Sequence, residues 1–244
     1  MSSFNYRLKK LNKVFDLRLV FYILKTNSKL KLFKGVIKNF DLSLKNTHFE
    51  LVRLFEEYLR SKPIDEKWKR NTNRFLTWIS IFEKKYTQNA QLKILEIGSH
   101  QGHSSLFFLW YFKNAYIDCV DIWDNIDNKS ELIFDESLNE FSERLKKNKY
   151  LSLDFFANKV KKKCIYDIIF IDGSHIADDV LSDCLLSFAA LKKNGLMIID
   201  DVFLMSEKRF QDNSLKAIDA FLNLKGDDIK ILKINSQLFL EKKN

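Results

Sequence analysis

Short apolar runs alternate along this chain with longer segments in which apolar residues recur at helical spacing. Runs of this length, rich in isoleucine, valine and phenylalanine, are typical of strands buried on both faces. The predicted strands cover residues 92–97, 116–121, 150–153, 166–171, 196–199, 229–232 and 237–240. The predicted helices between them cover residues 104–112, 131–147, 176–192 and 215–224. Strands that alternate with helices predict an α/β fold with a parallel sheet, and the last two strands predict an antiparallel β-hairpin.

The region before the first strand carries a helical pattern only. Thr47–Glu50 matches a capping box, which predicts a helix that starts at Thr47 and ends before Pro63. A second helix is predicted over residues 66–85, with aromatic residues on its inward face. His48 is predicted to lie on the surface near the helix start. Residues 1–45 mix lysines with apolar groups and predict one or two amphipathic helices.

Two glycines follow the first strand, at positions 98 and 102. Glycine lets a backbone turn sharply and approach a ligand closely. A dinucleotide fingerprint has the spacing G-x-G-x-x-G, but His100 and His103 replace its second and third glycines. This spacing argues against a pyrophosphate cradle and leaves a different nucleotide-like ligand as the expectation.

The next strand ends in an acidic residue, Asp121, 25 residues after Glu96. That distance fits one strand–turn–helix–strand unit, so the spacing places Asp121 beside the glycine turn. A carboxylate there can accept hydrogen bonds from both hydroxyls of a ribose. The alternative is that Asp121 is only a turn residue.

Four motifs together resemble the class I S-adenosylmethionine (SAM) dependent methyltransferases: E-x-G-x-x-x-G from Glu96, V-D-I-W-D from Val120, F-I-D-G-S-H from Phe170 and I-I-D-D from Ile198. The branch with D-G-S-H followed by an aspartate pair includes small-molecule and sugar O-methyltransferases. The resemblance implies a Rossmann-like, doubly wound, seven-stranded sheet with a terminal hairpin. It divides the chain into an N-terminal extension, residues 1–89, basic and then helical, and a methyltransferase domain, residues 90–244.

The resemblance also implies a SAM site. In that family the glycine turn lies under the amino-acid part of SAM, and Asp121 would bind the ribose. Ile122 and Trp123 would flank the adenine, and core packing is an equal alternative for Trp123. The implied cofactor residues are Glu96, Gly98, Ser99, His100, Gly102, Asp121, Ile122, Trp123, Ser152 and Asp172.

Acidic residues follow two predicted strands that are neighbours in this fold. Asp172 ends one strand, and Asp200 and Asp201 end the next. Three carboxylates without a thiolate suit Mg²⁺, Mn²⁺ or Ca²⁺ rather than zinc, and such a cation would lower the pKa of a substrate hydroxyl. His175 matches the position where metal-dependent O-methyltransferases carry their general base, which makes Asp172 and His175 the catalytic candidates. The alternative is that these residues only cap helices and turns.

The net charge of +9 belongs to one segment of the chain. Residues 1–45 carry 11 lysines and arginines against two acidic residues, whereas the other 199 residues carry 30 of each sign. Nucleic-acid binding by the methyltransferase domain is therefore not expected. The basic segment could contact an anionic surface, or its lysines could simply be solvated while its apolar residues pack on the domain.

The cysteines and the hydropathy of the chain indicate its cellular compartment. The three cysteines lack metal-ligand spacing, and no apolar run reaches the about 18 residues that span a membrane. We expect reduced cysteines in a cytoplasmic protein, peripheral to a membrane if the basic segment binds one.

SAM-dependent methyl transfer to a hydroxyl of a small molecule or glycan, with help from a divalent cation, is the leading hypothesis. The alternatives are a metal-independent methyltransferase acting on nitrogen or on a macromolecule, and a non-enzymatic binding module. Glu96, Gly98, Gly102 and Asp121 disfavour the last, since a fold alone does not need them. The sequence predicts neither the methyl acceptor nor the oligomeric state.

Overall fold

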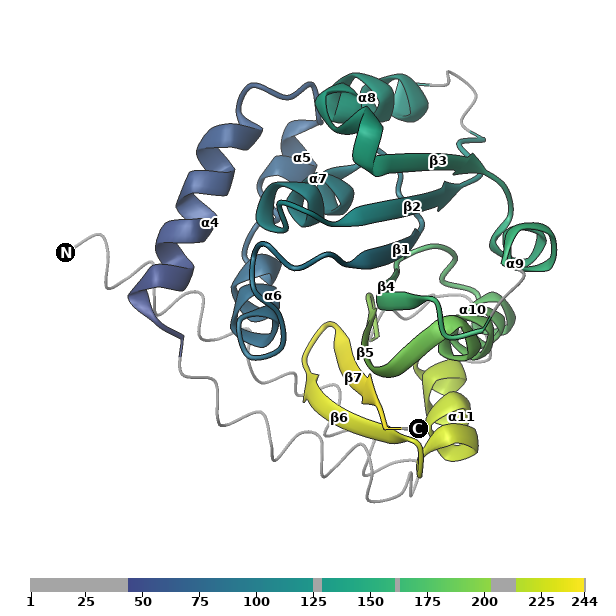
Figure 1. Ribbon diagram of the computed structural model, residues 1–244. Coiled ribbons are helices and arrows are strands. Elements are labelled where there is room, and N and C mark those ends of the chain that lie inside the picture. The colour runs from purple at the N-terminus through teal and green to yellow at the C-terminus, as the bar shows by residue number, and fades with distance from the viewer. Residues whose placement is uncertain (1–43, 125–128, 161–162, 203–213, 244) are drawn as a thin grey trace. The chain divides into compact units, whose positions relative to one another are not determined.

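The computed structural model describes residues 44–124, 129–160, 163–202 and 214–243. Its strands are β1 (Lys93–Ile97), β2 (Tyr116–Asp121), β3 (Leu145–Lys149), β4 (Tyr166–Ile171), β5 (Leu191–Ile199), β6 (Ile229–Ile234) and β7 (Leu238–Lys242). They form a seven-stranded sheet in the order β3-β2-β1-β4-β5-β7-β6 (Figure 1). β1, β2 and β3 pair in parallel, whereas β7 runs antiparallel to both β5 and β6. The predicted α/β sheet with a terminal antiparallel hairpin is confirmed.

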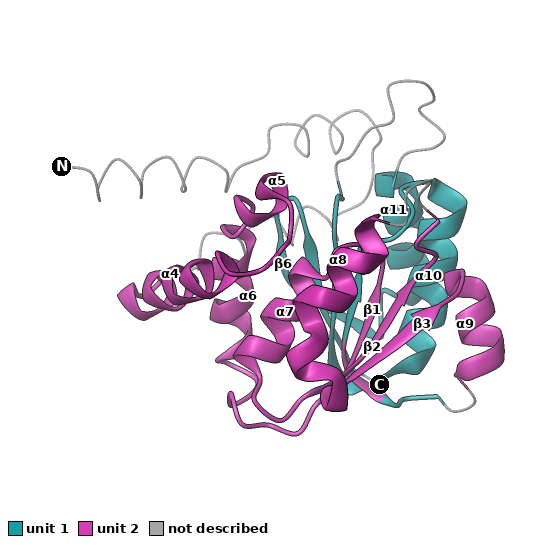
Figure 2. Ribbon diagram, turned by 90° about the horizontal axis from the view of Figure 1, so that it is seen from above, with its two compact units in different colours: residues 1–41, 162–165, 169–244 teal, residues 42–161, 166–168 magenta. Residues whose placement is uncertain are grey.

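The chain divides into two compact units (Figure 2). Unit 2 comprises residues 42–161 and 166–168, and unit 1 comprises residues 1–41, 162–165 and 169–244. The predicted amphipathic helices of residues 1–45 lie almost entirely outside the described residues. The division into residues 1–89 and 90–244 stays a prediction.

The helices of unit 2 are α4 (Asn46–Leu59), α5 (Glu66–Lys69), α6 (Arg74–Phe82), α7 (His103–Tyr111), α8 (Lys129–Leu138) and α9 (Ser152–Lys159). In Figure 2, α7 and α8 lie on one side of β1, β2 and β3, whereas α9 lies on the other. Helices on both faces explain why β1 and β2 are buried along most of their length.

An aromatic cluster joins the N-terminal helices to α7. The rings of Phe75 in α6 and Phe107 in α7 stack at 3.9 Å, and Phe55 in α4 meets Phe107 edge-on at 5.0 Å. All three side chains are fully buried. Burial of each contributes about 1.5–3 kcal/mol, so α4 and α6 are part of the core of unit 2.

Three predictions for the N-terminal helices are wrong in detail. α4 begins at Asn46 with Lys45 as its N-cap, and the Lys45 N–H donates to Nδ1 of His48 at 3.3 Å. His48 is buried, not on the surface, and its Nε2 lies 3.0 Å from Glu83. The helix predicted over residues 66–85 is split into α5 and α6, because buried Thr72 lies in a turn where its hydroxyl donates to Glu56 of α4.

The segment after α8 also differs from its prediction. The helix predicted to reach Lys147 ends at Leu138, and a 3₁₀-helix covers Asn139–Arg144. β3 then occupies residues 145–149 rather than 150–153, with Asn148 opposite Val120 of β2. β3 is an edge strand and is mostly polar, and its Lys147 and Lys149 pair with Glu131. It therefore lacks the apolar run of a central strand.

Unit 1 contains α10 (Ala177–Ala190), α11 (Ser214–Lys225), and strands β5, β6 and β7. Rings of Phe188 and Phe221 join α10 to α11 at 5.7 Å. The Asn194-Gly195 pair does not stop α10 as predicted, because α10 ends at Ala190 and the pair lies inside β5. Asn194 adopts a left-handed conformation there, with φ 60°, before the ladder with β7 starts at Leu196.

Candidate functional site

The turn between β1 and α7 has three residues in left-handed conformations: Gly98 with φ 86°, His100 with φ 44° and Gly102 with φ 82°. The Gly98 N–H donates to the carbonyl of Val120 at 2.8 Å, which ties the turn to β2. A Cβ at Gly102 would lie 2.6 Å from Leu138 of α8. Gly102 is therefore required both by its backbone conformation and by its packing.

Asp121 lies beside this turn, as its spacing from Glu96 predicts. Oδ2 of Asp121 accepts the N–H of His100 at 2.8 Å, and Oδ1 accepts the N–H of Trp123 at 2.8 Å. A carboxylate oxygen can accept two hydrogen bonds, so each oxygen keeps capacity for one hydroxyl. The carboxylate is oriented by the backbone before any ligand arrives.

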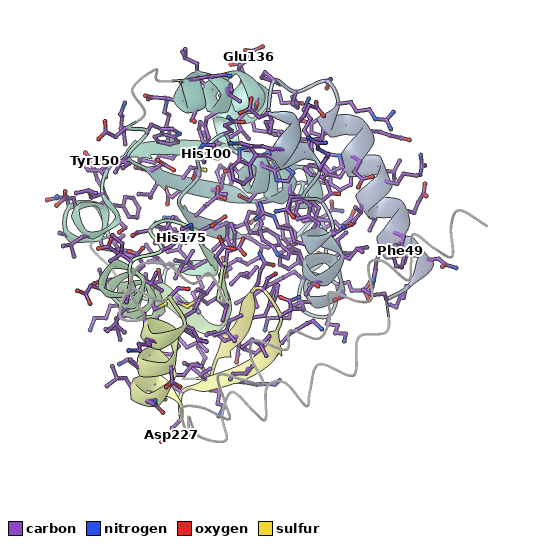
Figure 3. All side chains as sticks on the ribbon, turned by 180° about the vertical axis from the view of Figure 1, so that it is seen from behind. Phe49, His100, Glu136, Tyr150, His175 and Asp227 are labelled. Atoms are coloured by element: carbon purple, nitrogen blue, oxygen red, sulfur yellow. The ribbon has the colours of Figure 1, made fainter. Side chains whose placement is uncertain are left out.

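His100, labelled in Figure 3, is held in the turn by several contacts. Its carbonyl accepts the indole N–H of Trp123 at 2.7 Å, and its Nε2 lies 3.1 Å from the Ser130 hydroxyl of α8. Burial lowers the pKa of His100, which favours the neutral imidazole near neutral pH. These contacts indicate that the His100 side chain packs against its neighbours and supports the turn, rather than acting as a mobile acid or base.

Glu96, in β1, is fully buried. The hydroxyls of Ser104 and Ser105 in α7 donate to its two carboxylate oxygens. Burial raises the pKa of Glu96, and the two hydroxyls and the nearby Arg74 guanidinium oppose that rise. Glu96 thus fixes the start of α7 against β1.

The remaining predicted cofactor residues lie in varied surroundings. Ser99 is buried in the turn, and Ile122, directly after β2, is 46% exposed. Trp123 is 1% exposed and packs on Phe134 at 4.8 Å, so its ring belongs to the core between β2 and α8. Ser152 is the first residue of α9. The contacts of these residues with SAM stay predictions.

In unit 1, one ligand atom each from Asp172, His175 and Asp201 lies within 4.8 Å of the others. Asp172 follows β4, and His175 lies just before α10 (Figure 3). The Asp200 N–H donates to the carbonyl of Ile171 at 2.9 Å, which brings the end of β5 to the end of β4. Nε2 of His175 lies 3.7 Å from Oδ2 of Asp201.

The cluster of Asp172, His175 and Asp201 contains His175 where the predicted metal set of Asp172, Asp200 and Asp201 has Asp200. Oδ1 of Asp200 accepts the N–H of Asp201 at 2.8 Å, while His175 completes the group of three. Two carboxylates and one imidazole are a donor set that fits a hard divalent cation such as Mg²⁺ or Mn²⁺. Asp201 adopts φ 48°, a left-handed conformation that aspartate tolerates better than most residues.

Several residues that support the turn could not be recognised from the sequence. Ser104 and Ser105 lie in a segment that reads as an apolar helix, Asp65 belongs to no motif, and Gln101 occupies an unspecified position of the E-x-G-x-x-x-G motif. The Asp65 carboxylate accepts a hydrogen bond from the Gln101 amide at 2.8 Å. Only the contact itself identifies these residues.

The strand order, the glycine turn after β1 and the acidic residue after β2 define the fold of the class I SAM-dependent methyltransferases. The model of one protein family, described as a methyltransferase domain, matches residues 95–202. The resemblance stated from the motifs is thereby confirmed. No curated protein matches the chain significantly.

Solved structures with this fold include several methyltransferases. The MycE methyltransferase of mycinamycin biosynthesis, crystallised with Mg and SAH, is 18% identical with a TM-score of 0.53, over 69% of this chain and 48% of that one. A caffeoyl-CoA O-methyltransferase homologue from Staphylococcus aureus is 20% identical with a TM-score of 0.53, over 94% of this chain and 100% of that one. An O-methyltransferase from Bacillus cereus, in complex with SAH, is 16% identical with a TM-score of 0.55, over 86% and 96%.

At these identities the structural likeness establishes the fold. The chain spans about half the length of MycE, 48% of it. Among the helices of the described ranges, none has the length and apolar content needed to cross a bilayer.

Proposed function

We propose that this protein transfers the methyl group of SAM to a hydroxyl of a small molecule or sugar, with the assistance of a divalent cation. The observation that carries the hydroxyl assignment is the cluster of Asp172, His175 and Asp201, which combines hard cation ligands with an imidazole. MycE was crystallised with Mg, SAH and the small molecule mycinamycin VI, which supports this substrate class.

The proposed SAM site is the glycine turn with Asp121. The two oriented carboxylate oxygens of Asp121 suit the two ribose hydroxyls, and the left-handed backbone at Gly98 and Gly102 permits close approach of the methionine part. When bound, SAM supplies a methyl group on a positively charged sulfur. The other cofactor contacts proposed are Glu96, Ser99, His100, Ile122, Trp123, Ser152 and Asp172.

The proposed cation ligands are Asp172, Asp200 and Asp201, and a bound cation would lower the pKa of the acceptor hydroxyl. His175 accepts the proton of that hydroxyl as the general base. Asp201, 3.7 Å from Nε2 of His175, orients the imidazole and stabilises it once protonated. Methyl transfer is then an in-line displacement for which the protein supplies alignment.

The test uses SAM labelled in its methyl group and a panel of sugars, phenols and other hydroxylated small molecules. We expect labelled product from at least one hydroxyl compound, loss of product in a chelator and recovery with Mg²⁺ or Mn²⁺. The Asp201→Asn variant should retain SAH binding and lose turnover. Label transferred to a protein or an amine, or turnover unchanged by the chelator, would contradict the proposal.

The basic segment, residues 1–45, is proposed to contact an anionic surface. We expect salt-sensitive sedimentation of the full chain with phosphatidylserine vesicles. Glutamate in place of Lys9, Lys10 and Lys13 should abolish it without changing SAH affinity. Equal sedimentation of both proteins would show that these lysines are merely solvated.

A further inference from the structure

The candidate cofactor turn is contacted by residues that lie outside the region matched by the methyltransferase family model. Asp65, immediately before α5, exchanges two hydrogen bonds with Gln101 inside the turn. The Asp65 N–H donates to Oε1 of Gln101 at 2.9 Å, and Nε2 of Gln101 donates to Oδ2 of Asp65 at 2.8 Å. Gln101 is 3% exposed, so this reciprocal pair fixes the amide on both sides. The family match begins only at residue 95.

A second contact from the same segment reaches the neighbouring turn residue. The ring of Trp68 in α5 meets the imidazole of His100 edge-on, with centroids 5.3 Å apart. Ile64, which precedes Asp65, is 2% exposed and anchors the segment in the core of unit 2. Residues 64–68 therefore hold both inner residues of the turn, His100 and Gln101, through independent contacts.

The turn needs such support because of its backbone. His100 has φ 44°, a conformation that a residue with a Cβ adopts at an energetic cost, and one glycine on each side, Gly98 and Gly102, adds flexibility. A turn that must present its backbone to a ligand binds more tightly when its conformation is fixed beforehand. The Asp65–Gln101 pair is a hydrogen bond to a charged group, which is stronger than one between neutral groups.

We infer that Asp65 and Trp68 are positioning residues for the cofactor turn: they hold Gln101 and His100 in the conformation that binds SAM. This inference rests on the proposed function, because it assigns the role through the SAM site. It makes α5, a helix without any sequence motif, a part of the cofactor-binding machinery.

The test exchanges donor and acceptor within the pair. Gln101→Glu places a second carboxylate against Asp65 and removes the amide donor. Adding Asp65→Asn restores the pair with reversed polarity, since the new amide donates to the new carboxylate and the N–H of residue 65 still donates to it. The control is Glu56→Gln, which alters the hydrogen bond with Thr72 outside the turn.

Calorimetry measures SAH affinity of the full chain, and thermal unfolding measures Tm in parallel. We expect Gln101→Glu to weaken SAH binding by about tenfold or more, and the double variant to return within about threefold of the wild type. Glu56→Gln should leave SAH affinity unchanged at any Tm. An unchanged affinity in Gln101→Glu, or no recovery in the double variant, would overturn the inference.

Two further variants cover the case in which Gln101→Glu does not fold. Asp65→Ala and Trp68→Ala change only residues outside the turn, and each should weaken SAH binding about threefold or more. Hydrogen exchange of residues 64–70 should slow on SAH binding in the wild type and less so in Asp65→Ala. A wild type that does not bind SAH would refute the proposed function itself, whereas equal binding by the wild type and both alanine variants would refute only the inference.

Discussion

Replacement of Asp121 by asparagine tests the cofactor site most directly. In the wild type the two carboxylate oxygens accept the backbone N–H groups of His100 and Trp123. An asparagine keeps one acceptor oxygen and turns an amide N–H₂ toward the other backbone donor. One backbone hydrogen bond is lost, which costs about 1 kcal/mol of folding stability.

The effect on ligand binding should be larger than the effect on stability. A ribose hydroxyl bonded to a carboxylate contributes about 1.5–3 kcal/mol, which corresponds to about 10–100-fold in Kd. Asparagine can still accept from one ribose hydroxyl. We therefore expect Asp121→Asn to weaken SAH binding by about tenfold, nearer the lower end of that range.

A double cycle separates ribose binding from turn shape. Calorimetry with SAH and with its 2′,3′-dideoxy analogue, on wild type and Asp121→Asn, should give a coupling energy of at least about 1 kcal/mol. The matched control on the same strand is Asp118→Asn, which loses the charge that accepts the Tyr166 hydroxyl at 2.8 Å and should change Tm only. If Asp121→Asn lost the same affinity for both ligands, Asp121 would act only by shaping the turn.

Three further predictions follow from the described contacts. Gly102→Ala should destabilise the fold by about 1–3 kcal/mol in urea unfolding, because the new Cβ would lie 2.6 Å from Leu138 at φ 82°; unchanged stability would show that the turn relaxes freely. Asp201→Asn should weaken Mn²⁺ binding, measured by calorimetry, by about tenfold or more while SAH affinity is retained. Burial holds the pKa of His103 well below its usual value, so below pH about 6.5 the unfolded chain takes up a proton that the folded protein does not. Stability should therefore be full above that pH and fall below it, by up to about 1.4 kcal/mol per pH unit, and His103→Gln should remove this part of the slope between pH 7.5 and 5.5 in urea titrations.

The sequence predicted those parts of the fold that are buried on both faces. β1, β2 and β4 are buried along most of their length and are mostly apolar, although Glu96 and Asp118 interrupt the apolar runs of β1 and β2. The position of Asp121 beside the turn was predictable for a related reason. One strand–helix–strand unit has a nearly fixed length, so a spacing of 25 residues from Glu96 leaves little freedom.

The parts that could not be predicted depend on contacts with distant residues. Edge strand β3 is mostly polar, and its lysines pair with Glu131 of α8, so no apolar run marks its register. The break between α5 and α6 occurs at Thr72, whose hydroxyl bonds Glu56 in another helix. Asn194-Gly195 is a typical helix stop, yet the chain is already extended at Leu191, which is fully buried.

The polar residues that support the candidate site could not be predicted from the sequence either. The motif identified Glu96, but not the two α7 hydroxyls that occupy both of its oxygens. The fold brings Asp65 to Gln101 across 36 positions of chain. Residue types thus indicated which chemistry the site could support, and only the fold showed which side chains fix one another.

His175 has two candidate roles, general base and cation ligand, and one variant can distinguish them. A general base needs a free ring nitrogen, but Nε2 of His175 faces Asp201 at 3.7 Å in a group of three potential cation ligands. If His175 is the base, His175→Ala should lower turnover by about 100-fold and leave Mn²⁺ affinity unchanged, because Asp172, Asp200 and Asp201 hold the cation. If His175 is instead a ligand, the same variant should weaken Mn²⁺ binding by at least about tenfold. Loss of a residue that only hydrogen-bonds to a metal ligand already has an effect of that size. Calorimetric titration of the SAH-bound protein with Mn²⁺ distinguishes the two before any acceptor is known, and weakened metal binding would refute the base assignment.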